Sequence, residues 1–200
     1  MIGALRGLLL AKTPPQLLIE AAGVGYEVEA PLSTFYVLPA TGQEVRLLTH
    51  LVVREDAHVL YGFATAEERG LFRALLKVSG VGPKIALGVL SAVTVEAFGD
   101  CVRAGDAGAL TKIPGIGRKT AERLVIEMRD RVGDFAANKI AFDGSGVPIE
   151  GPGARGEAFS ALLALGYKPA EATRLLKAVA GEGHSTEHLI RQALQGAVRA

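Results

Sequence analysis

Hydrophobic positions change their spacing along the chain, and the first change falls near residue 63. Before it, apolar residues alternate with polar ones or form short runs, a pattern typical of β-strands. Turn-forming groups such as Thr13–Pro15 and Pro39–Gly42 separate these runs. The pattern predicts five strands, at Leu5–Lys12, Gln16–Ala21, Tyr26–Ala30, Glu44–Val53 and His58–Phe63. Five short strands at this spacing suggest a small closed barrel, for which the OB fold is the common five-stranded form.

From residue 64 to residue 142 the apolar spacing is helical. Thr65 and Glu68 stand three residues apart, as in a capping box, and predict that a helix begins there. The expected helices are Ala66–Val78, Pro83–Leu90, Val95–Ala104, Ala107–Lys112 and Arg118–Val132. We therefore expect a second domain that is entirely helical.

Residues 143–156 lose this periodicity and are rich in glycine and proline, which indicates a flexible linker. Residues 157–200 regain it, and Gly166, Pro169, Gly181 and Ser185 mark the ends of three short helices. These are expected at Glu157–Leu165, Pro169–Ala180 and Thr186–Val198. A three-helix bundle of this size, similar to a UBA domain, buries little surface and suits partner binding better than chemistry.

The charge of the chain is unevenly distributed. The 200 residues are 49% hydrophobic and 22% charged, which is enough apolar material for packed cores and too much for disorder. The net charge is +1, but residues 1–63 carry four basic against six acidic side chains, and residues 64–142 carry twelve against nine. Because residues 1–63 are acidic and residues 64–142 are basic, the positions of the charges are more informative than the net charge.

Nothing in the sequence predicts an oxidising or membrane environment. Cys101 is the single cysteine, so no disulfide framework can form, and a small buried thiol in a reducing cytosol is expected. No apolar stretch approaches the roughly 20 residues of a membrane span, and the N-terminus lacks the features of a signal peptide. We expect a cytoplasmic protein without membrane contact.

One pattern occurs twice in the helical segment, at Val78–Ala86 and again 35 residues later at Ile113–Ala121. Each copy has the form apolar-x-Gly-apolar-Gly, followed by a helix with a basic residue in its first turn. This resembles the helix-hairpin-helix motif. Paired glycines allow a tight turn and a close approach of the backbone to a ligand. The helix that follows offers unpaired N–H groups and the positive end of its dipole, which together favour an anion.

The two copies predict two sites that bind DNA phosphates without contacting the bases, and therefore without sequence specificity. In each copy the apolar residue between the glycines should plug into the core, and the basic residues should add charge. One copy alone could be a turn that serves only to pack two helices against each other. Two copies with the basic residue at the same position favour a shared ligand. The candidate DNA-binding residues are Gly80, Val81, Gly82, Lys84, Gly115, Ile116, Gly117, Arg118, Lys119 and Arg123.

The fold class that these patterns predict is a multidomain α+β protein. An OB-fold β-barrel is expected at residues 1–63, and an all-α double helix-hairpin-helix domain at residues 64–142. The linker at 143–156 and the three-helix bundle at 157–200 complete the predicted order of domains.

Other phosphate-binding and catalytic motifs are incomplete. A P-loop would need a glycine where Lys112 stands, and Ile85 and Thr120 occupy the third glycine position of Gly-x-Gly-x-x-Gly. The second hairpin also resembles helix-hairpin-helix DNA glycosylases, in which the lysine matching Lys119 is a Schiff-base nucleophile. The aspartate of those enzymes would fall at Ala137, and one cysteine cannot hold their four-cysteine cluster. We expect no catalytic residue, and a glycosylase or lyase that uses Lys119 is the alternative function.

Over its whole length the chain resembles the RuvA family, whose members are subunits of the Holliday junction branch-migration machine. Besides both hairpins, the segments that carry the resemblance are Met1–Gly3, Gly23–Val28, Val52–Ala57, Leu60–Phe63 and Leu165–Pro169, in that order. The resemblance implies a homotetramer that holds a four-way junction open, with one or two tetramers at each junction. It also implies two partners, the hexameric ATPase RuvB and the resolvase RuvC, and no cofactor.

Glu55 and Asp56 lie in the turn between the last two predicted strands. By themselves, two acids in a hairpin turn indicate no more than a solvated loop. The resemblance implies that they form an acidic pin near the centre of the tetramer. Carboxylates repel phosphates, so a negative centre inside a basic ring would favour a junction whose strands part there over a continuous duplex. Arg54 beside them would balance charge or touch the DNA backbone.

The resemblance further implies that apolar residues of the C-terminal bundle bind RuvB. The candidates are Leu162, Leu165, Tyr167, Leu189 and Leu194. An exposed apolar patch on so small a bundle fits this role, although at least one of the first three should fill the bundle's core. His184 and His188 are four residues apart with no third ligand near them, so no metal site is expected.

Two further functions share part of this pattern. A nuclease-associated repair subunit would carry tandem hairpins, but it would need clustered acids for metal ions, which the basic middle segment does not show. A general scaffold for double-stranded DNA would have no use for an acidic turn. The affinity for a four-way junction, compared with that for a linear duplex of equal length, separates these functions.

Overall fold

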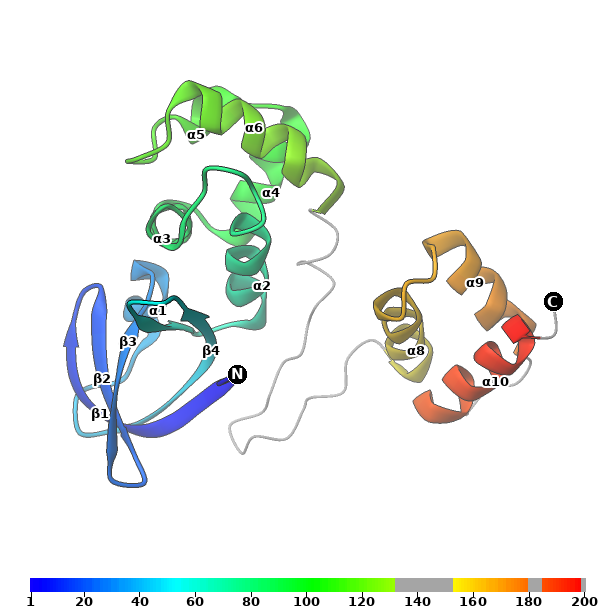
Figure 1. Cartoon of the computed structure of the whole chain (residues 1–200), viewed down its shortest axis with the longest axis horizontal. Coiled ribbons are helices and arrows are strands. Elements are labelled where there is room, and N and C mark those ends of the chain that lie inside the picture. The colour runs from blue at the N-terminus through cyan, green and yellow to red at the C-terminus, as the bar shows by residue number, and fades with distance from the viewer. Residues whose placement is uncertain (132–152, 180–184, 199–200) are drawn as a thin grey trace. The chain divides into compact units, whose positions relative to one another are not determined.

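The structure of the protein, a computed structural model, describes residues 1–131, 153–179 and 185–198 (Figure 1). The chain forms two compact units, one within Met1–Lys139 and the other within Ile140–Ala200. All strands of the described residues belong to the first unit. Most of the linker predicted at 143–156 lies outside the described residues.

Five strands of the first unit close into a barrel in the order β1-β2-β3-β5-β4. Neighbouring strands pair antiparallel except β3 and β5, which run parallel. The predicted five-stranded barrel of the OB type is confirmed. Its inward-facing side chains form an apolar core in which Leu9, Ile19 and Leu47 are at most 1% exposed. The strands are β1 (Ala4–Thr13), β2 (Gln16–Ala21), β3 (Val24–Glu29), β4 (Glu44–Val53) and β5 (His58–Phe63).

The hydrophobic pattern does not predict α1 (Leu32–Val37), a helix of six residues between β3 and β4. It follows Pro31 without a side-chain cap, so the usual start signal is missing. Its Thr34 is fully buried and links the barrel to the helical region. The Thr34 hydroxyl donates to the Glu68 carboxylate at 3.3 Å and accepts from the Ala64 N–H at 3.1 Å.

The helix α2 (Ala66–Leu75) begins at the predicted capping residue. Thr65 Oγ1 accepts a hydrogen bond from the Glu68 N–H at 3.1 Å. The Glu68 carboxylate reaches one residue further back than in a capping box, because it accepts from the N–H of Ala64 at 3.2 Å as well as from Thr34. Only 9% of Glu68 is exposed, so α1, the end of β5 and α2 meet at one buried carboxylate.

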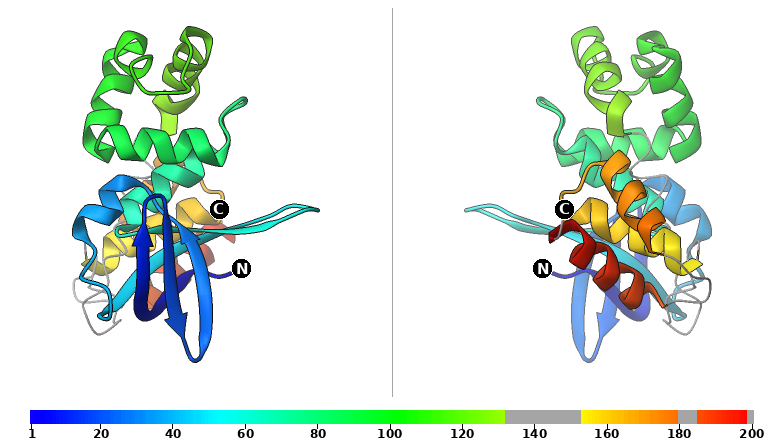
Figure 2. Two further views of the ribbon diagram at one scale, coloured as in Figure 1. Left: turned by 90° about the vertical axis from the view of Figure 1, so that its left-hand side faces the viewer. Right: turned by 90° about the vertical axis from the view of Figure 1, so that its right-hand side faces the viewer.

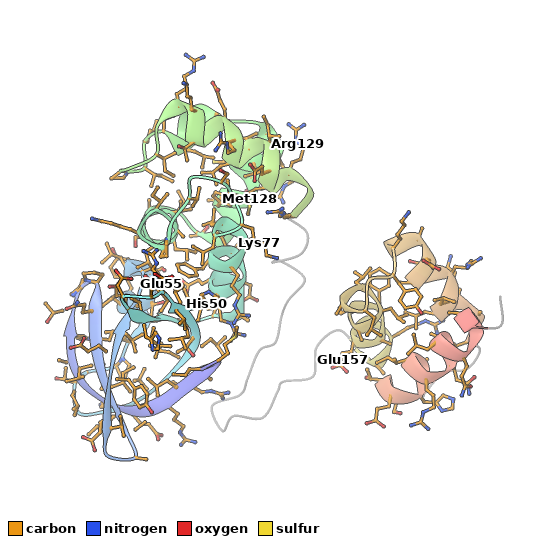
Figure 3. The ribbon with its side chains drawn as sticks, in the orientation of Figure 1. His50, Glu55, Lys77, Met128, Arg129 and Glu157 are labelled. Carbon is orange, nitrogen blue, oxygen red and sulfur yellow. The ribbon has the colours of Figure 1, made fainter. Side chains whose placement is uncertain are left out.

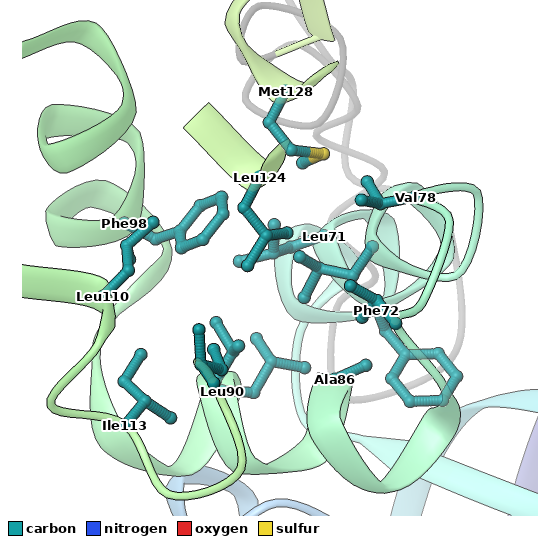
Figure 4. Close-up of a cluster of buried hydrophobic side chains, with 14 of the residues drawn as sticks. Leu71, Phe72, Val78, Ala86, Leu90, Phe98, Leu110, Ile113, Leu124 and Met128 are labelled. Carbon is teal, nitrogen blue, oxygen red and sulfur yellow. The ribbon is translucent and has the colours of Figure 1, made fainter. Parts of the chain in front are cut away.

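A second core lies between the helices of the first unit and continues into the barrel (Figure 4). Phe98 and Leu124 are fully buried at its centre. Phe72 joins this core to the barrel, since its ring centroid lies 4.9 Å from that of Phe63 and 5.0 Å from that of Tyr61. The remaining segments of the first unit are α3 (Pro83–Ala92), α4 (Val95–Ala104), α5 (Ala107–Leu110), α6 (Arg118–Met128) and the 3-10 turn η1 (Arg129–Arg131).

The predicted helices of the first unit are all present, but some end earlier than predicted. The helix α2 stops at Leu75 rather than Val78, because the N–H groups of Lys77 and Val78 bond to carbonyls only three residues back. Such bonds tighten the last turn of a helix. The same tightening ends α5 at Leu110, before the second hairpin.

Three helices form the second unit and enclose a core of their own. Its fully buried side chains include Ala158, Leu162 and Ala172. The predicted three-helix bundle is therefore present, although its first helix begins at Gly153 and not at Glu157. The helices are α8 (Gly153–Ala164), α9 (Pro169–Ala178) and α10 (Thr186–Val198).

We predict that Glu68→Ala lowers the free energy of unfolding by about 1–3 kcal/mol, because the buried Thr34 hydroxyl loses its acceptor. Glu68→Gln keeps one acceptor oxygen and should recover part of this loss. Glu67→Ala is the matched control, since it removes a neighbouring carboxylate from the same first turn of α2. Thermal unfolding measures all three variants, and equal losses for Glu67→Ala and Glu68→Ala would contradict the assignment.

Candidate nucleic-acid interface

The two hairpins have the same backbone geometry. Gly80 and Gly115 both adopt the left-handed conformation, with φ of 84° and 86°. Gly82 and Gly117, the N-cap residues of α3 and α6, have φ of −93° and −81° and ψ of 174° and 166°. The repeat found in the sequence is thus a repeat of structure. We call Gly80 and Gly115 the turn glycines, and Gly82 and Gly117 the cap glycines.

Between the two glycines of each hairpin an apolar side chain enters the core, as predicted. Val81 is 6% exposed and Ile116 is 5% exposed. Their N–H groups are also occupied, because each donates at 3.1 Å to a carbonyl three residues back, that of Val78 or Ile113. Val81 and Ile116 therefore fix the hairpins from inside, and neither side chain can touch a ligand. This corrects the prediction that counted both among the DNA-binding residues.

The helix ends that follow the cap glycines are open. Neither α3 nor α6 has a side-chain cap, so the N–H groups of the first turn face outward without the oxygen that usually satisfies them. A Cβ added at Gly82 or at Gly117 would meet no atom within 4 Å. Such an end can bind a phosphate through backbone N–H groups and the helix dipole.

Basic side chains lie beside both open helix ends. Lys84 and Lys119 are exposed, each in the first turn of its helix. Arg118 is also exposed, but its Nε donates to Glu122 Oε1 at 3.0 Å. An exposed pair of this kind contributes little to stability and can open for a stronger anion. The two lysines are therefore the cations most available for a phosphate.

Arg123 connects the two hairpins, a role that the sequence analysis missed. Its Nη1 donates to the Ser79 carbonyl in the first hairpin at 2.9 Å. In return, the second hairpin lies against α3, where the Pro114 carbonyl is 3.8 Å from the Cβ that Gly88 lacks. Ser79 and Pro114 are 35 residues apart, as are Gly88 and Arg123. The hairpins thus pack reciprocally, and only the alignment of Arg123 with Gly88 could have indicated it.

The strands β4 and β5 extend from the barrel as a two-stranded arm (Figure 2). Its tip is closed by a hydrogen bond of 2.9 Å from the Arg54 N–H to the Ala57 carbonyl. Glu55 and Asp56 lie at this tip and are exposed. Among the residues that the structure describes, neither carboxylate forms an ion pair, so both remain available to act on charges outside the chain.

The structure separates the apolar candidates of the second unit into two groups. Leu162 and Leu189 are buried in the bundle core, at 0% and 3% exposure, so they cannot form a contact surface as predicted. Leu165 is 61% exposed, while Tyr167 and Leu194 are partly buried at the edge of the core. His184 lies outside the described residues.

The described part of the chain was also compared with the requirements of a metal site, of the alternative enzyme and of a membrane span. It contains no group of three His, Cys, Asp or Glu side chains that could hold a metal ion. Lys119, the nucleophile of the alternative function, is exposed to solvent and does not lie in an apolar pocket. No single described helix has the length and apolarity to cross a membrane, and α3 with α4 would do so only as a pair bent by 98°.

A five-stranded barrel joined to two reciprocally packed hairpins with open helix ends defines a DNA-binding protein of the tandem helix-hairpin-helix class. The family model of the RuvA N-terminal domain matches residues 1–62, and that of the SAM-like helix-hairpin-helix tandem matches residues 72–130. The model of the RuvA C-terminal domain matches residues 153–197.

Full-length relatives carry the same architecture. Proteins named Holliday junction branch migration complex subunit RuvA from Nitrosococcus oceani, Thioalkalivibrio sulfidiphilus and Vibrio cholerae are 57%, 56% and 51% identical to this chain. Each similarity covers at least 98% of both chains. The chain belongs to the RuvA family.

We predict that alanine at a cap glycine weakens junction binding, whereas alanine at a turn glycine destabilises the fold. Gly82→Ala and Gly117→Ala should change the free energy of unfolding by less than about 1 kcal/mol, because both positions have ordinary φ values. They should weaken junction binding roughly tenfold, since the methyl group stands where the phosphate approaches. Gly80→Ala and Gly115→Ala should instead destabilise the fold by about 1–2 kcal/mol, because an L-residue strains at positive φ. Melting curves and junction titrations of the four variants measure both effects, and a cap-glycine variant with unchanged affinity would refute the open-end site.

Proposed function

We propose that this protein binds four-way DNA junctions, holds them open, and brings the ATPase RuvB to them for branch migration in recombination and repair. The observation that carries the proposal is that one compact unit combines two equivalent hairpins, each followed by an uncapped helix start, with an acidic tip that forms no ion pair. The names of the relatives, branch migration complex subunit, support the same conclusion.

The hairpins would bind DNA through its phosphates. Gly82 and Gly117 lie at helix starts without a side-chain cap, and the exposed Lys84 and Lys119 add charge. Contacts of this type position DNA without reading its sequence. Two equivalent sites in one unit suit two points along one duplex backbone, so a junction with arms of any sequence is an appropriate ligand.

The acidic tip would supply the preference for a junction. In a homotetramer with fourfold symmetry, four arms of DNA meet four copies of the chain, and the β4–β5 arms converge at the centre. Glu55 and Asp56 would then place about eight negative charges near the crossover, where they repel a continuous duplex. A junction avoids this cost because its strands part at that point. One tetramer, or two on opposite faces, satisfies this geometry.

The second unit would bind the ATPase RuvB. Leu165 is exposed, and Tyr167 and Leu194 lie partly buried nearby in the same bundle. Apolar residues that a small bundle leaves at its surface are typical of a protein contact. We assign this contact to RuvB, and the resolvase RuvC would act on the same held-open junction.

The protein itself would perform no catalysis and need no cofactor. ATP hydrolysis falls to RuvB, since the hairpins lack the glycine pattern of a P-loop. Lys119 acts in this proposal as a phosphate ligand, which suits its exposure. The site of action is the cytoplasm, where bacterial chromosomal DNA lies.

The acidic tip provides the direct test of this function. We predict that Glu55→Gln with Asp56→Asn raises the affinity for linear duplex more than the affinity for a four-way junction, because the repulsion that excludes duplex is gone. The melting temperature should barely change, since exposed substitutions alter stability by less than about 0.5 kcal/mol. Titrations of both DNAs at one salt concentration measure the preference. Glu20→Gln with Glu27→Gln, two exposed carboxylates on β2 and β3, is the control. An undiminished preference for the junction would show that the tip is only a solvated turn.

A further inference from the structure

A groove in the first unit connects the first hairpin to the tip of the β4–β5 arm. Its volume of about 870 Å³ lies within the range of clefts that bind small ligands. Gly82 and Lys84 of the hairpin line it, and so do Arg54 and Asp56 of the tip. Glu55, which Figure 3 labels, precedes Asp56 in the same turn. We call this space the hairpin groove.

The walls of the hairpin groove are mainly apolar. Val52 and Val59 form a cross-strand pair of β4 and β5, and both line the groove. Ile85 of α3 and the two prolines of the β1–β2 turn line it as well. The three aliphatic side chains are partly buried, so part of their apolar surface is left for a ligand to cover. These walls suit a ligand with apolar faces.

Two polar side chains in the lining are left without a partner among the described residues. Tyr61 is 6% exposed and Glu29 is partly buried, and no hydrogen bond or ion pair joins either side chain to another described residue. Burial and then the charge of Glu29 raise the pKa of Tyr61, whereas the charge of Arg54 lowers it, so both charges lie near the hydroxyl. Polar groups this far from water are normally hydrogen-bonded. The groove therefore offers hydrogen bonds to a ligand that enters it.

The charges of the lining decide which part of a nucleotide fits the groove. Lys84 comes from the hairpin and Arg54 from the tip, so each can attract a phosphate of a strand that passes between them. Glu29 and Asp56 add two carboxylates, which repel a phosphate from the groove itself. The uncharged part of a nucleotide, with apolar faces and a polar edge, is its base. The Tyr61 hydroxyl can both donate and accept, so it suits the edge of any base.

We infer that the hairpin groove receives an unpaired base of the junction, from the strand that runs between the first hairpin and the crossover. The inference rests on the proposed function and deepens it. Branch migration breaks base pairs at the crossover before new pairs form, so unpaired bases occur there. Extracting a base from a continuous duplex costs pairing and stacking energy, which an already unpaired base does not cost. The groove thus favours a junction over a duplex independently of the charge of the acidic tip.

Junctions with one extra nucleotide at the crossover test the inference with the full-length protein. One junction carries an unpaired adenine, and the matched junction carries an abasic nucleotide, so neither has a base pair to break. The wild type should bind the first roughly tenfold more tightly, as expected for one stacked base. Val59→Phe fills the groove and should bind both junctions equally. Tyr61→Phe keeps the ring beside Phe72 but removes the hydroxyl, and should reduce the difference. Val24→Phe, at an exposed position of β3, is the matched control and should preserve it.

Melting curves identify folded variants, and Tyr61→Phe covers the case in which Val59→Phe unfolds. Equal affinities of the wild type for the two junctions, both above that for linear duplex, would overturn the inference and leave the proposed function intact. A wild type that binds linear duplex as tightly as either junction would refute the proposed function, and the inference with it. Native mass spectrometry measures the assembly. A Val59→Phe variant with altered assembly and an unchanged difference between the junctions would assign the groove to a protein surface and overturn the inference.

Discussion

The left-handed turn at Gly80 and Gly115 is the constraint on which the rest of the structure depends. At φ of 84° and 86° the chain reverses direction within each hairpin and sends the next residue, Val81 or Ile116, into the core. The following helix then begins at a cap glycine with its first N–H groups unsatisfied. Stability and the candidate phosphate site thus come from the same few residues. The apolar plug holds the hairpin, and the hairpin holds the open helix end toward solvent.

Because this geometry occurs twice, the two sites constrain each other. Arg123 fastens α6 to the first hairpin, and the second hairpin lies against α3. The single core around Phe98 and Leu124 extends through Phe72 to the barrel, so both sites and the β4–β5 arm belong to one compact unit. This matters for the proposed function, because the distance between the phosphate sites and the acidic tip would then distinguish an open junction from a duplex.

Most of the fold follows from the sequence because its elements have strong local signals. The strands β2, β4 and β5 and the helix α4 have the predicted bounds, since turn residues and caps such as Thr94 mark their ends. The helix α1 has no such signal, because it is only six residues long and Pro31 at its N-cap position provides no side-chain cap. Its position depends instead on the Thr34–Glu68 hydrogen bond, which joins residues far apart in sequence.

The candidate site was predictable where it repeats and unpredictable where it depends on tertiary contacts. The glycines and lysines of the hairpins stand out through the offset of 35 residues. The bond of Arg123 to Ser79, and the burial that removes Leu162 and Leu189 from the surface, depend on packing that no local pattern encodes.

The central claim is that the two hairpins are equivalent phosphate-binding sites. The salt dependence of junction binding tests this claim most directly. The logarithm of the association constant falls linearly with the logarithm of salt concentration, with a slope of about −0.9 for each phosphate contacted. Lys84→Ala and Lys119→Ala should each reduce the slope by roughly one contact per chain, by equal amounts and for arms of any sequence. The double variant should lose about twice as much. Unequal slopes, or a loss that depends on the base sequence of the arms, would contradict the account.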